Sequence, residues 1–488
     1  MLEALQANAL AVAGSLLAAI LVALLIFRKS DPKDAPPKVY TGLPFIGNVQ
    51  CFVKGPLQMI QMFYEKHGAV FTTPMFGKNI TFLIGPEAQA PFFKHKDEVL
   101  SQNEVYGFMK PVFGPGIVYD AEPARRSEQM KAMANGLRVS RLQAYVPKIE
   151  KEVREFTKAW GDSGEFDIME VLSDLTILTA SRCLHGDDVR ENLHHQVAQL
   201  YHDLDQGITP VSFFLPNAPI PQHFKRNAAR KEMCRLFGEV IRARRKAGPE
   251  ANAKNTDILQ IFMDLKYKDG GAPTNDEVTG MLIALLFAGQ HTSSISSTWT
   301  LAFAMLNPDI MKRLEEEQAQ VVGDADAPVT WEHLGNMELM HNCMREALRM
   351  FPPLIMLMRY ARQDFAVTSK GTEYTVPKGS LVFTSPAVAM RIPEVFKDPD
   401  TFDPDRYAPP REEHKAPYAY LGFGAGMHQC MGQQFGFLQV KTLVSILLRN
   451  FEFELIEKKM PELNYESMVV GPKGNIMVRY KRRAAAAK

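Results

Sequence analysis

The sequence predicts a mainly α-helical fold with small β-sheets, preceded by one membrane-spanning helix at the N-terminus. Three segments, near residues 140–160, 225–246 and 277–306, carry the spacing of apolar residues that is typical of long helices. Runs rich in β-branched and aromatic residues are short and bounded by Gly or Pro, as at 70–73 and 80–85. Helices therefore dominate the predicted fold.

The composition indicates one folded body. The 488 residues exceed the roughly 100–200 of a typical domain, so the chain can enclose a large core or a buried cofactor. The 46% of hydrophobic and 23% of charged residues exclude a disordered chain and a polytopic membrane protein. Lys and Arg number 56 against 55 Asp and Glu, a net charge of +1, which argues against a nucleic-acid-binding protein.

The predicted membrane anchor occupies residues 1–31. Residues 9–27 contain no charge, and a helix of that length covers about 28 Å, close to the thickness of a bilayer's hydrocarbon core. Glu3 precedes the span, whereas Arg28 and Lys29 follow it, so the remainder of the chain is expected in the cytosol. A cleaved signal sequence and a buried core helix are the alternatives.

A proline-rich hinge is expected at residues 32–48, because Pro32, Pro36, Pro37 and Pro44 interrupt helical structure there. One catalytic domain is expected at residues 49–480. A basic, alanine-rich tail follows at residues 481–488.

One of the five cysteines has distinctive neighbours. The cysteines lack CxxC spacing, which argues against a structural zinc site or a disulfide framework. Cys430, however, lies in a glycine-rich loop just before an amphipathic helical stretch, at about residues 433–449. Glycines let a planar group approach the backbone, and a helix N-terminus favours a thiolate. These are the properties that an axial haem ligand needs. The alternative is an inert buried cysteine.

The segment 423–432, which begins with Phe423 and Gly424, resembles the cysteine-ligand loop of the cytochrome P450 superfamily, FxxGxRxCxG. The resemblance implies the cytochrome P450 fold and haem b, with Cys430 as the ligand of its iron. His428 stands where the motif has Arg, so its contact with a haem propionate depends on its protonation state or hydrogen bonding.

Two further motifs follow the order of this superfamily. Glu346 and Arg349 form an ExxR pair on one face of a helix, which by itself would indicate a solvated surface pair. Arg406 lies in the segment 404–407, of sequence PDRY, between that pair and the cysteine loop. The resemblance assigns these three residues to a structural network that supports the haem.

A polar patch interrupts an apolar helix at residues 289–294. The spacing of Thr274 and Glu277 predicts a capping box at the start of this helix. A kinked core helix with satisfied hydroxyls is one interpretation. The patch also resembles the oxygen-activating stretch of the superfamily, in which Thr292 would take part in proton delivery. His291 at its position is characteristic of sterol 14α-demethylases.

The segment 106–120 resembles the YxxFxxPxFGxxVxYD signature of that narrower family. By this resemblance Tyr106, Gln102 and Arg359 contact the haem propionates, and Asp205 pairs with His291 as a gate and proton route. The residues expected to line an apolar sterol cavity are Phe108, Met109, Phe113, Tyr119, Ala288, Ile355, Met356, Met358, Met468 and Val469.

The resemblance implies three successive monooxygenations that remove the 14α-methyl group of a sterol as formic acid and leave a 14,15 double bond. Electrons would come from NADPH through a separate cytochrome P450 reductase, in the endoplasmic reticulum membrane, and azole inhibitors are expected to bind. Phe108 favours an obtusifoliol-like substrate, with lanosterol or eburicol as alternatives. Another membrane-bound lipid hydroxylase and a haem-containing sterol carrier or sensor are the competing functions.

Overall fold

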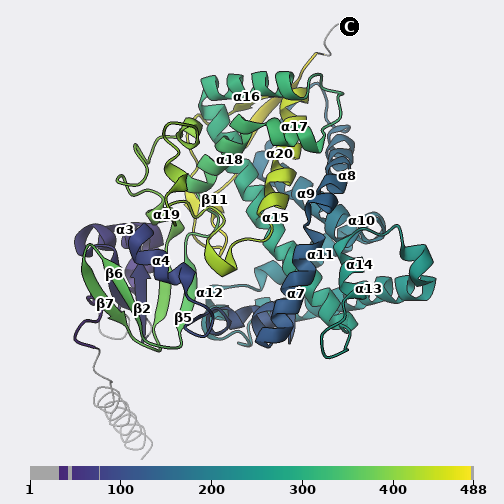
Figure 1. Ribbon diagram of the computed structural model, residues 1–488. Coiled ribbons are helices and arrows are strands. Elements are labelled where there is room, and N and C mark those ends of the chain that lie inside the picture. Colours follow the sequence, from purple (N-terminus) through teal and green to yellow (C-terminus); the bar gives the residue numbers. More distant parts are fainter. Residues whose placement is uncertain (1–31, 42–46, 76, 485–488) are drawn as a thin grey trace, which may run out of the picture.

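A computed structural model describes residues 32–41, 47–75 and 77–484, and helices make up most of it (Figure 1). The three segments with helical spacing form α8, α13 and α15, so those predictions are confirmed. The principal helices are α3 (Pro56–His67), α4 (Pro86–Lys94), α7 (Pro123–Gly136), α8 (Val139–Thr157), α9 (Ile168–Ala180), α11 (His194–Gln206), α12 (Pro210–Phe214), α13 (Pro221–Asn252), α14 (Ile258–Asp264), α15 (Asn275–Leu306), α16 (Pro308–Val321), α17 (Trp331–Asn336), α18 (Glu338–Met350), α19 (Pro386–Ala389) and α20 (Gln433–Asn450).

Helix α15 crosses the centre of the molecule (Figure 1). It begins with the predicted capping box: the Glu277 backbone N–H donates to Thr274 Oγ1 over 3.2 Å, and the Thr274 N–H donates to Glu277 Oε2 over 2.8 Å. Among the described residues it is the one helix long and apolar enough to cross a membrane, but 67% of its apolar window is buried inside the protein. Its apolar character is therefore that of a core helix. The predicted anchor at residues 1–31 lies outside the described residues.

The predicted short strands form one edge of a five-stranded sheet. The sheet has the order β1-β2-β8-β5-β3, and its strands are β1 (Val70–Met75), β2 (Lys78–Leu83), β8 (Leu381–Thr384), β5 (Leu357–Ala361) and β3 (Leu100–Ser101). β2 and β8 are parallel, and β5 runs antiparallel to β8 with Arg359 opposite Val382. This register fixes the position of Met358 and Arg359 beside the helical body.

Three smaller sheets complete the β structure. They consist of β4 (Ser163–Asp167), β12 (Met477–Arg482) and β9 (Phe451–Leu455); β6 (Phe365–Ser369) and β7 (Thr372–Val376); and β10 (Leu463–Asn464) and β11 (Gly471–Pro472). Lys481, expected to begin the tail, belongs to β12. Val39, in the predicted hinge, is buried and hydrogen-bonds to Thr72 of β1, so part of that segment packs on the sheet.

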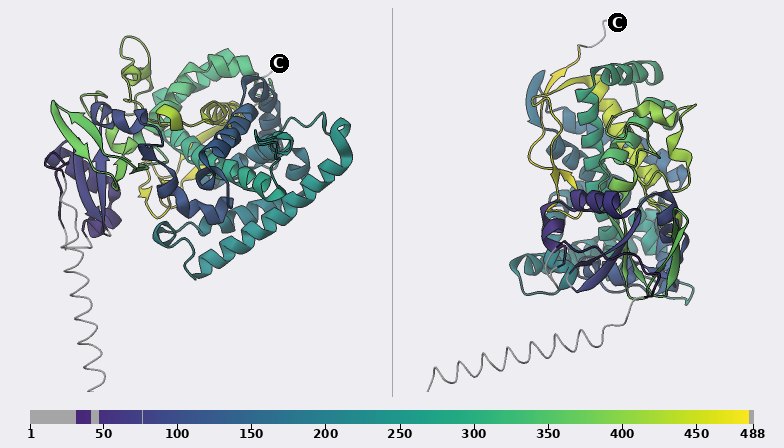
Figure 2. Two further views of the ribbon diagram at one scale, coloured as in Figure 1. Left: turned by 60° about the horizontal axis from the view of Figure 1, so that its bottom comes forward. Right: turned by 90° about the vertical axis from the view of Figure 1, so that its left-hand side faces the viewer.

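Two apolar cores meet at the site. The larger one lies among the helices, around side chains such as Trp299 and Tyr145. The second surrounds the five-stranded sheet, where the rings of Phe71 and Phe82 stack 5.2 Å apart. Figure 2 shows this sheet on one side of the helical body. Tyr106 packs against both cores, which places the segment 102–120 at the boundary between them.

Candidate active site

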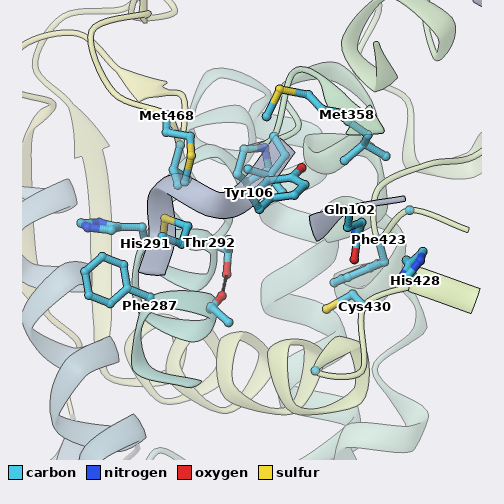
Figure 3. A pocket seen from close by; sticks show the side chains of 18 of the residues that line it. Gln102, Tyr106, Phe287, His291, Thr292, Met358, Phe423, His428, Cys430 and Met468 are labelled. Atoms are coloured by element: carbon cyan, nitrogen blue, oxygen red, sulfur yellow. Dashed lines mark hydrogen bonds between the residues drawn. The ribbon is translucent and has the colours of Figure 1, made fainter. Parts of the chain in front are cut away.

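A cavity of about 1060 Å³ lies between α15, the segment 102–120, strand β5 and the loop that carries Cys430 (Figure 3). A volume of this size accommodates a large ligand. The predicted site residues that line it are Gln102, Tyr106, Met109, Phe113, Tyr119, Asp205, Ala288, His291, Thr292, Ile355, Met356, Met358, Arg359, Phe423, Gly424, His428, Cys430, Met468 and Val469.

The cysteine loop is held by its own backbone and by α4. The Cys430 N–H donates to the Phe423 carbonyl over 2.9 Å. Gly424 and Gly426 have φ values of 68° and 69°, a conformation that glycine adopts without strain. A Cβ added at Gly426 would lie 2.2 Å from the Phe93 carbonyl oxygen of α4. Glycine at 426 is therefore required both by the turn and by the close approach of α4.

The Cys430 thiol faces the cavity (Figure 3). Its side chain is accessible from the cavity, while protein encloses it on its other sides. Burial raises the pKa of the Cys430 thiol, and the backbone N–H groups of Gly432 and Gln433 act in the opposite direction. The expected N–H donors before and at the start of α20 are thus present, but their lowering of the thiol pKa is smaller than the rise that burial causes. A metal cation bound to the sulfur would supply the additional stabilisation that a thiolate requires.

One edge of the cavity carries a buried cation without an ion-pair partner among the described residues. Arg359 is 4% exposed. Its Nη1 donates to the Met358 carbonyl over 2.7 Å, and its guanidinium lies 4.7 Å from the centroid of the Phe92 ring. Burial lowers the pKa of Arg359. Since an unpaired buried charge is costly, this edge favours an anionic ligand group.

Arg126 and Asp97 belong to the same edge, and sequence reasoning missed both. Arg126 Nη2 donates to Gln102 Oε1 over 2.6 Å, and its Nη1 lies 3.4 Å from Asp97 Oδ2. Asp97 Oδ1 lies 2.8 Å from His428 Nε2. Burial raises the pKa of Asp97, but the hydrogen bond and charge of His428, with Arg126 and Arg359, outweigh it and lower the pKa. Neither residue lies in a motif, so no sequence signal marked them.

The polar patch of α15 faces the cavity from the other side. Thr292 Oγ1 donates to the Ala288 carbonyl over 2.6 Å. The helix continues without interruption to Leu306. The Thr292 hydroxyl therefore reaches the cavity surface from a regular helix and not from a kinked one. His291 Nε2 lies 3.1 Å from Asp205 Oδ1, although its N–H is not oriented for a hydrogen bond. The structure thus brings the predicted pair within ion-pair distance.

Phe108 was expected on the cavity wall but lies behind it. It is 6% exposed and is not among the described residues that line the cavity. Its ring centroid lies 6.1 Å from that of Tyr106 and 5.6 Å from that of Phe213. Tyr106 itself stacks on Tyr119 at 4.7 Å. A 3-10 turn at residues 107–109 directs the Phe108 ring into the core, so Phe108 can act on a ligand only through its neighbours.

Glu346, Arg349 and Arg406 form a buried network outside the cavity. All three side chains are 0% exposed. Glu346 accepts hydrogen bonds from Arg349 over 2.8 Å and from Arg406 Nε over 2.9 Å. This network joins α18 to the turn η4 (Pro404–Tyr407). The alternative of a solvated surface pair is therefore wrong.

The residues around the cavity fit the expected haem. Cys430 lines one wall and would supply the thiolate, an established ligand of haem iron. Arg359 supplies a buried cation that has no close ion pair among the described residues, although the charge of Asp97 acts on it, and a carboxylate could bind there. The apolar side chains of Met358, Phe113 and Val469 leave space beside α15 for a second, lipid-like molecule.

Comparison with known proteins agrees with this geometry. Residues 37–479 match the Cytochrome P450 family. The chain is 46% identical to the sterol 14-demethylase of Arabidopsis thaliana, with 96% of each chain covered. It is 46% identical to the obtusifoliol 14-alpha demethylase of Sorghum bicolor (94% and 93% covered) and 40% identical to the lanosterol 14-alpha demethylase of Homo sapiens (92% and 87%). The solved structure of retinoic acid-bound cyanobacterial CYP120A1 is similar, with a TM-score of 0.80, 25% identity and coverage of 93% and 100%.

Proposed function

The chain belongs to the cytochrome P450 family, within it to the sterol 14-demethylases, and we propose that it removes the 14α-methyl group of a C4-monomethylated, obtusifoliol-like sterol. It is a haem-thiolate monooxygenase that uses a sterol, O2 and a redox partner. The observation that carries the proposal is that Cys430, Thr292 and the apolar residues of β5 line the same cavity. Release of formic acid from 14α-methyl sterols tests it.

Haem b would be held by Cys430 at the iron and by Arg359, Arg126, Gln102 and His428 at the propionates. When bound, the thiolate-ligated haem supplies dioxygen activation. These contacts would hold the propionates at the edge of the cavity that carries Arg359 and Arg126. Charge-assisted hydrogen bonds from guanidinium groups are among the stronger polar contacts available to a carboxylate.

The protein's own contribution to the chemistry is proton delivery and positioning. Thr292 Oγ1 is a hydroxyl at the cavity surface, and its present acceptor is a backbone carbonyl one turn earlier. Rotation of this hydroxyl would present its proton to the cavity. Asp205 and His291 are both partly exposed, with side chains 26% and 25% accessible. They form a route along which a proton can pass from solvent to the polar patch.

The proton route is tested by Asp205→Asn, with Asp203→Asn as the matched control. Asp203 lies two residues earlier on α11 and does not line the cavity. We expect Asp205→Asn to slow formate release, to raise peroxide formation per NADPH consumed and to enlarge the solvent isotope effect. Asp203→Asn should leave all three unchanged. If Asp205→Asn released as much formate per NADPH consumed as the wild type does, Asp205 would have no part in the mechanism.

The preference for one C4 methyl group is proposed to arise from Phe108 acting through Tyr106 and Phe213. A bulky ring behind the wall restricts how far Tyr106 can move to admit a second methyl group. Competition between obtusifoliol and lanosterol tests it, and Phe108→Leu should shift the ratio of kcat/KM values toward lanosterol. Phe262→Leu removes a buried ring outside the cavity and should not shift this ratio. A lanosterol preference in the wild type would contradict the proposal.

The partner and location are proposed from the family. Electrons would come from NADPH through a membrane-bound cytochrome P450 reductase in the endoplasmic reticulum, and azoles would bind in the cavity. Removal of residues 1–31 should release the protein from membranes while the haem-thiolate spectrum is retained. Unchanged sedimentation with membranes would show that this segment is not the anchor.

A further inference from the structure

A second cleft of about 460 Å³ lies away from the sterol cavity, between α17, α18, η4 and the first half of α20. These helices lie together above the cysteine loop in Figure 1. The cleft shares no lining residue with the sterol cavity among the described residues. Its volume falls in the range of pockets that bind small molecules.

The cleft contains a buried ammonium group without a carboxylate partner. Lys441 is 6% exposed, and its Nζ donates to the Leu334 carbonyl over 2.7 Å. Among the described residues no carboxylate oxygen lies within 4.0 Å of Nζ, and the charges of Glu317 and Glu338 act on Lys441 only from farther away. Burial lowers the pKa of Lys441 to about 8, a value at which the group is still mostly protonated at neutral pH. An ammonium group has three donors, so two remain for a ligand.

Four of the other lining residues carry aromatic rings. The centroids of the His341 and Phe437 rings lie 4.1 Å apart. Trp331 and Tyr407 also line the cleft, together with aliphatic side chains such as Leu334 and Leu438 and polar ones such as Asn342 and Gln434. Burial and nearby cations, Lys441 first among them, lower the pKa of His341 to about 3, so this imidazole is neutral and adds no second charge. Such walls favour an aromatic ring over a hydrated ion.

The acidic groups near the cleft restrict the charge of the ligand. Glu338 is exposed on the lining, and Glu317 is the other carboxylate whose charge acts on Lys441. A dianion would be repelled by both. A single carboxylate at the inner end of a ring-bearing molecule would reach Lys441 while the ring contacts Phe437.

We propose that this cleft binds a small aromatic monocarboxylate, with its carboxylate on Lys441 and its ring against Phe437 and His341. The bound carboxylate would supply the close ion pair that Lys441 lacks among the described residues, where Glu317 and Glu338 act on it only from a distance. The proposed ligand would contact the Phe437 ring, whose centroid lies 5.0 Å from that of Phe423 in the cysteine loop.

The test is saturation-transfer NMR with 3-phenylpropionate on the full-length, haem-loaded protein, in the presence of saturating sterol so that the large cavity is filled. We expect saturable binding that weakens at least tenfold in Lys441→Met and is unchanged in Lys458→Met, which removes an ammonium 77% exposed on the surface. The neutral alcohol 3-phenylpropanol should bind at least tenfold more weakly than the acid.

Either of two binding results would overturn the proposal, as would the competition result given next: no saturable binding of 3-phenylpropionate at millimolar concentration, or equal binding of the acid and the alcohol. Displacement of the acid by sterol would assign its signal to the large cavity and would also overturn it. Circular dichroism and the reduced-CO spectrum establish that Lys441→Met is folded. If that variant does not fold, the comparison of acid with alcohol on the wild type decides, and it does so without any sterol turnover.

Discussion

The buried carboxylate of Glu346 allows a quantitative prediction, because its neighbours are fully enclosed. Oε1 accepts hydrogen bonds from Arg349 Nη2, Arg406 Nε and the Asp403 backbone N–H, at 2.8, 2.9 and 3.1 Å. Oε2 accepts from Arg349 Nε at 2.8 Å and from Tyr407 Oη at 2.9 Å. Glu346→Gln keeps the volume but replaces one of these oxygens by an amide nitrogen. At least one guanidinium N–H of Arg349 then faces another donor, whereas the Tyr407 hydroxyl can rotate to accept.

We expect Glu346→Gln to lower the free energy of unfolding by about 3–5 kcal/mol, the usual cost of removing one partner from a buried charge network. The assay is urea unfolding of the haem-loaded protein, followed by circular dichroism and by loss of the haem spectrum. The matched control is Asp405→Asn, whose pair with Arg313 is exposed on both sides, at 57% and 44%. That control should cost about 1 kcal/mol or less.

The comparison between the two variants is decisive. If Glu346→Gln lost no more stability than Asp405→Asn, the buried network would not hold α18 to the segment before the cysteine loop. The structural role given to Glu346 would then be wrong. A loss confined to haem retention, with unfolding unchanged, would place the effect at the cofactor instead of the fold.

Three further predictions follow from single residues. Gly426→Ala should abolish haem retention, because the added Cβ would lie 2.2 Å from the Phe93 carbonyl oxygen. Gly424 has nearly the same φ but open space around it, so Gly424→Ala should cost only backbone strain of about 1–2 kcal/mol. Equal haem content in the two variants would contradict the clash. Cys430→Ser should lose the thiolate-haem band of the reduced-CO spectrum and formate release together, and a retained band would contradict its role as ligand. The pKa of Lys441 is about 8 in the folded protein and 10.5 in the unfolded chain, so the unfolded chain binds more protons between these pH values. The free energy of unfolding should therefore rise by about 3 kcal/mol as the pH increases from 8 to 10.5. Denaturant titrations should show this rise in the wild type and not in Lys441→Met, and the same pH dependence in both proteins would contradict the prediction.

Local sequence determined the elements whose geometry depends on neighbouring residues. The glycine spacing around Cys430 indicated a tight loop before a helix, and the structure has one. The capping box at Thr274 and Glu277 marked the start of α15. In each case the hydrogen bonds and dihedral angles join residues only a few positions apart, so the pattern of residue types carries the information.

The resemblance to a known family supplied the longer-range pairs. His291 and Asp205 are 86 positions apart, and the helix periodicity of neither segment indicates that they meet. The structure places them 3.1 Å apart. The same holds for Arg406 and Glu346, whose contact depends on how the segment after α19 returns to α18.

Only the tertiary structure decided which side chains form the remaining parts of the site. Asp97 and Arg126 join the propionate edge because the segments before and after the 102–120 loop fold back beside His428. Phe108 lies off the cavity lining because its ring packs into the larger core, 5.6 Å from the ring of Phe213, whereas Met109 of the same 3-10 turn lines the cavity. Lys441 resembles an ordinary helix lysine in the sequence and becomes a buried cation because α17 and α18 cover α20. Burial and charge pairing depend on contacts between segments distant in the chain, and a sequence pattern of period 3.6 or 2 does not specify those contacts.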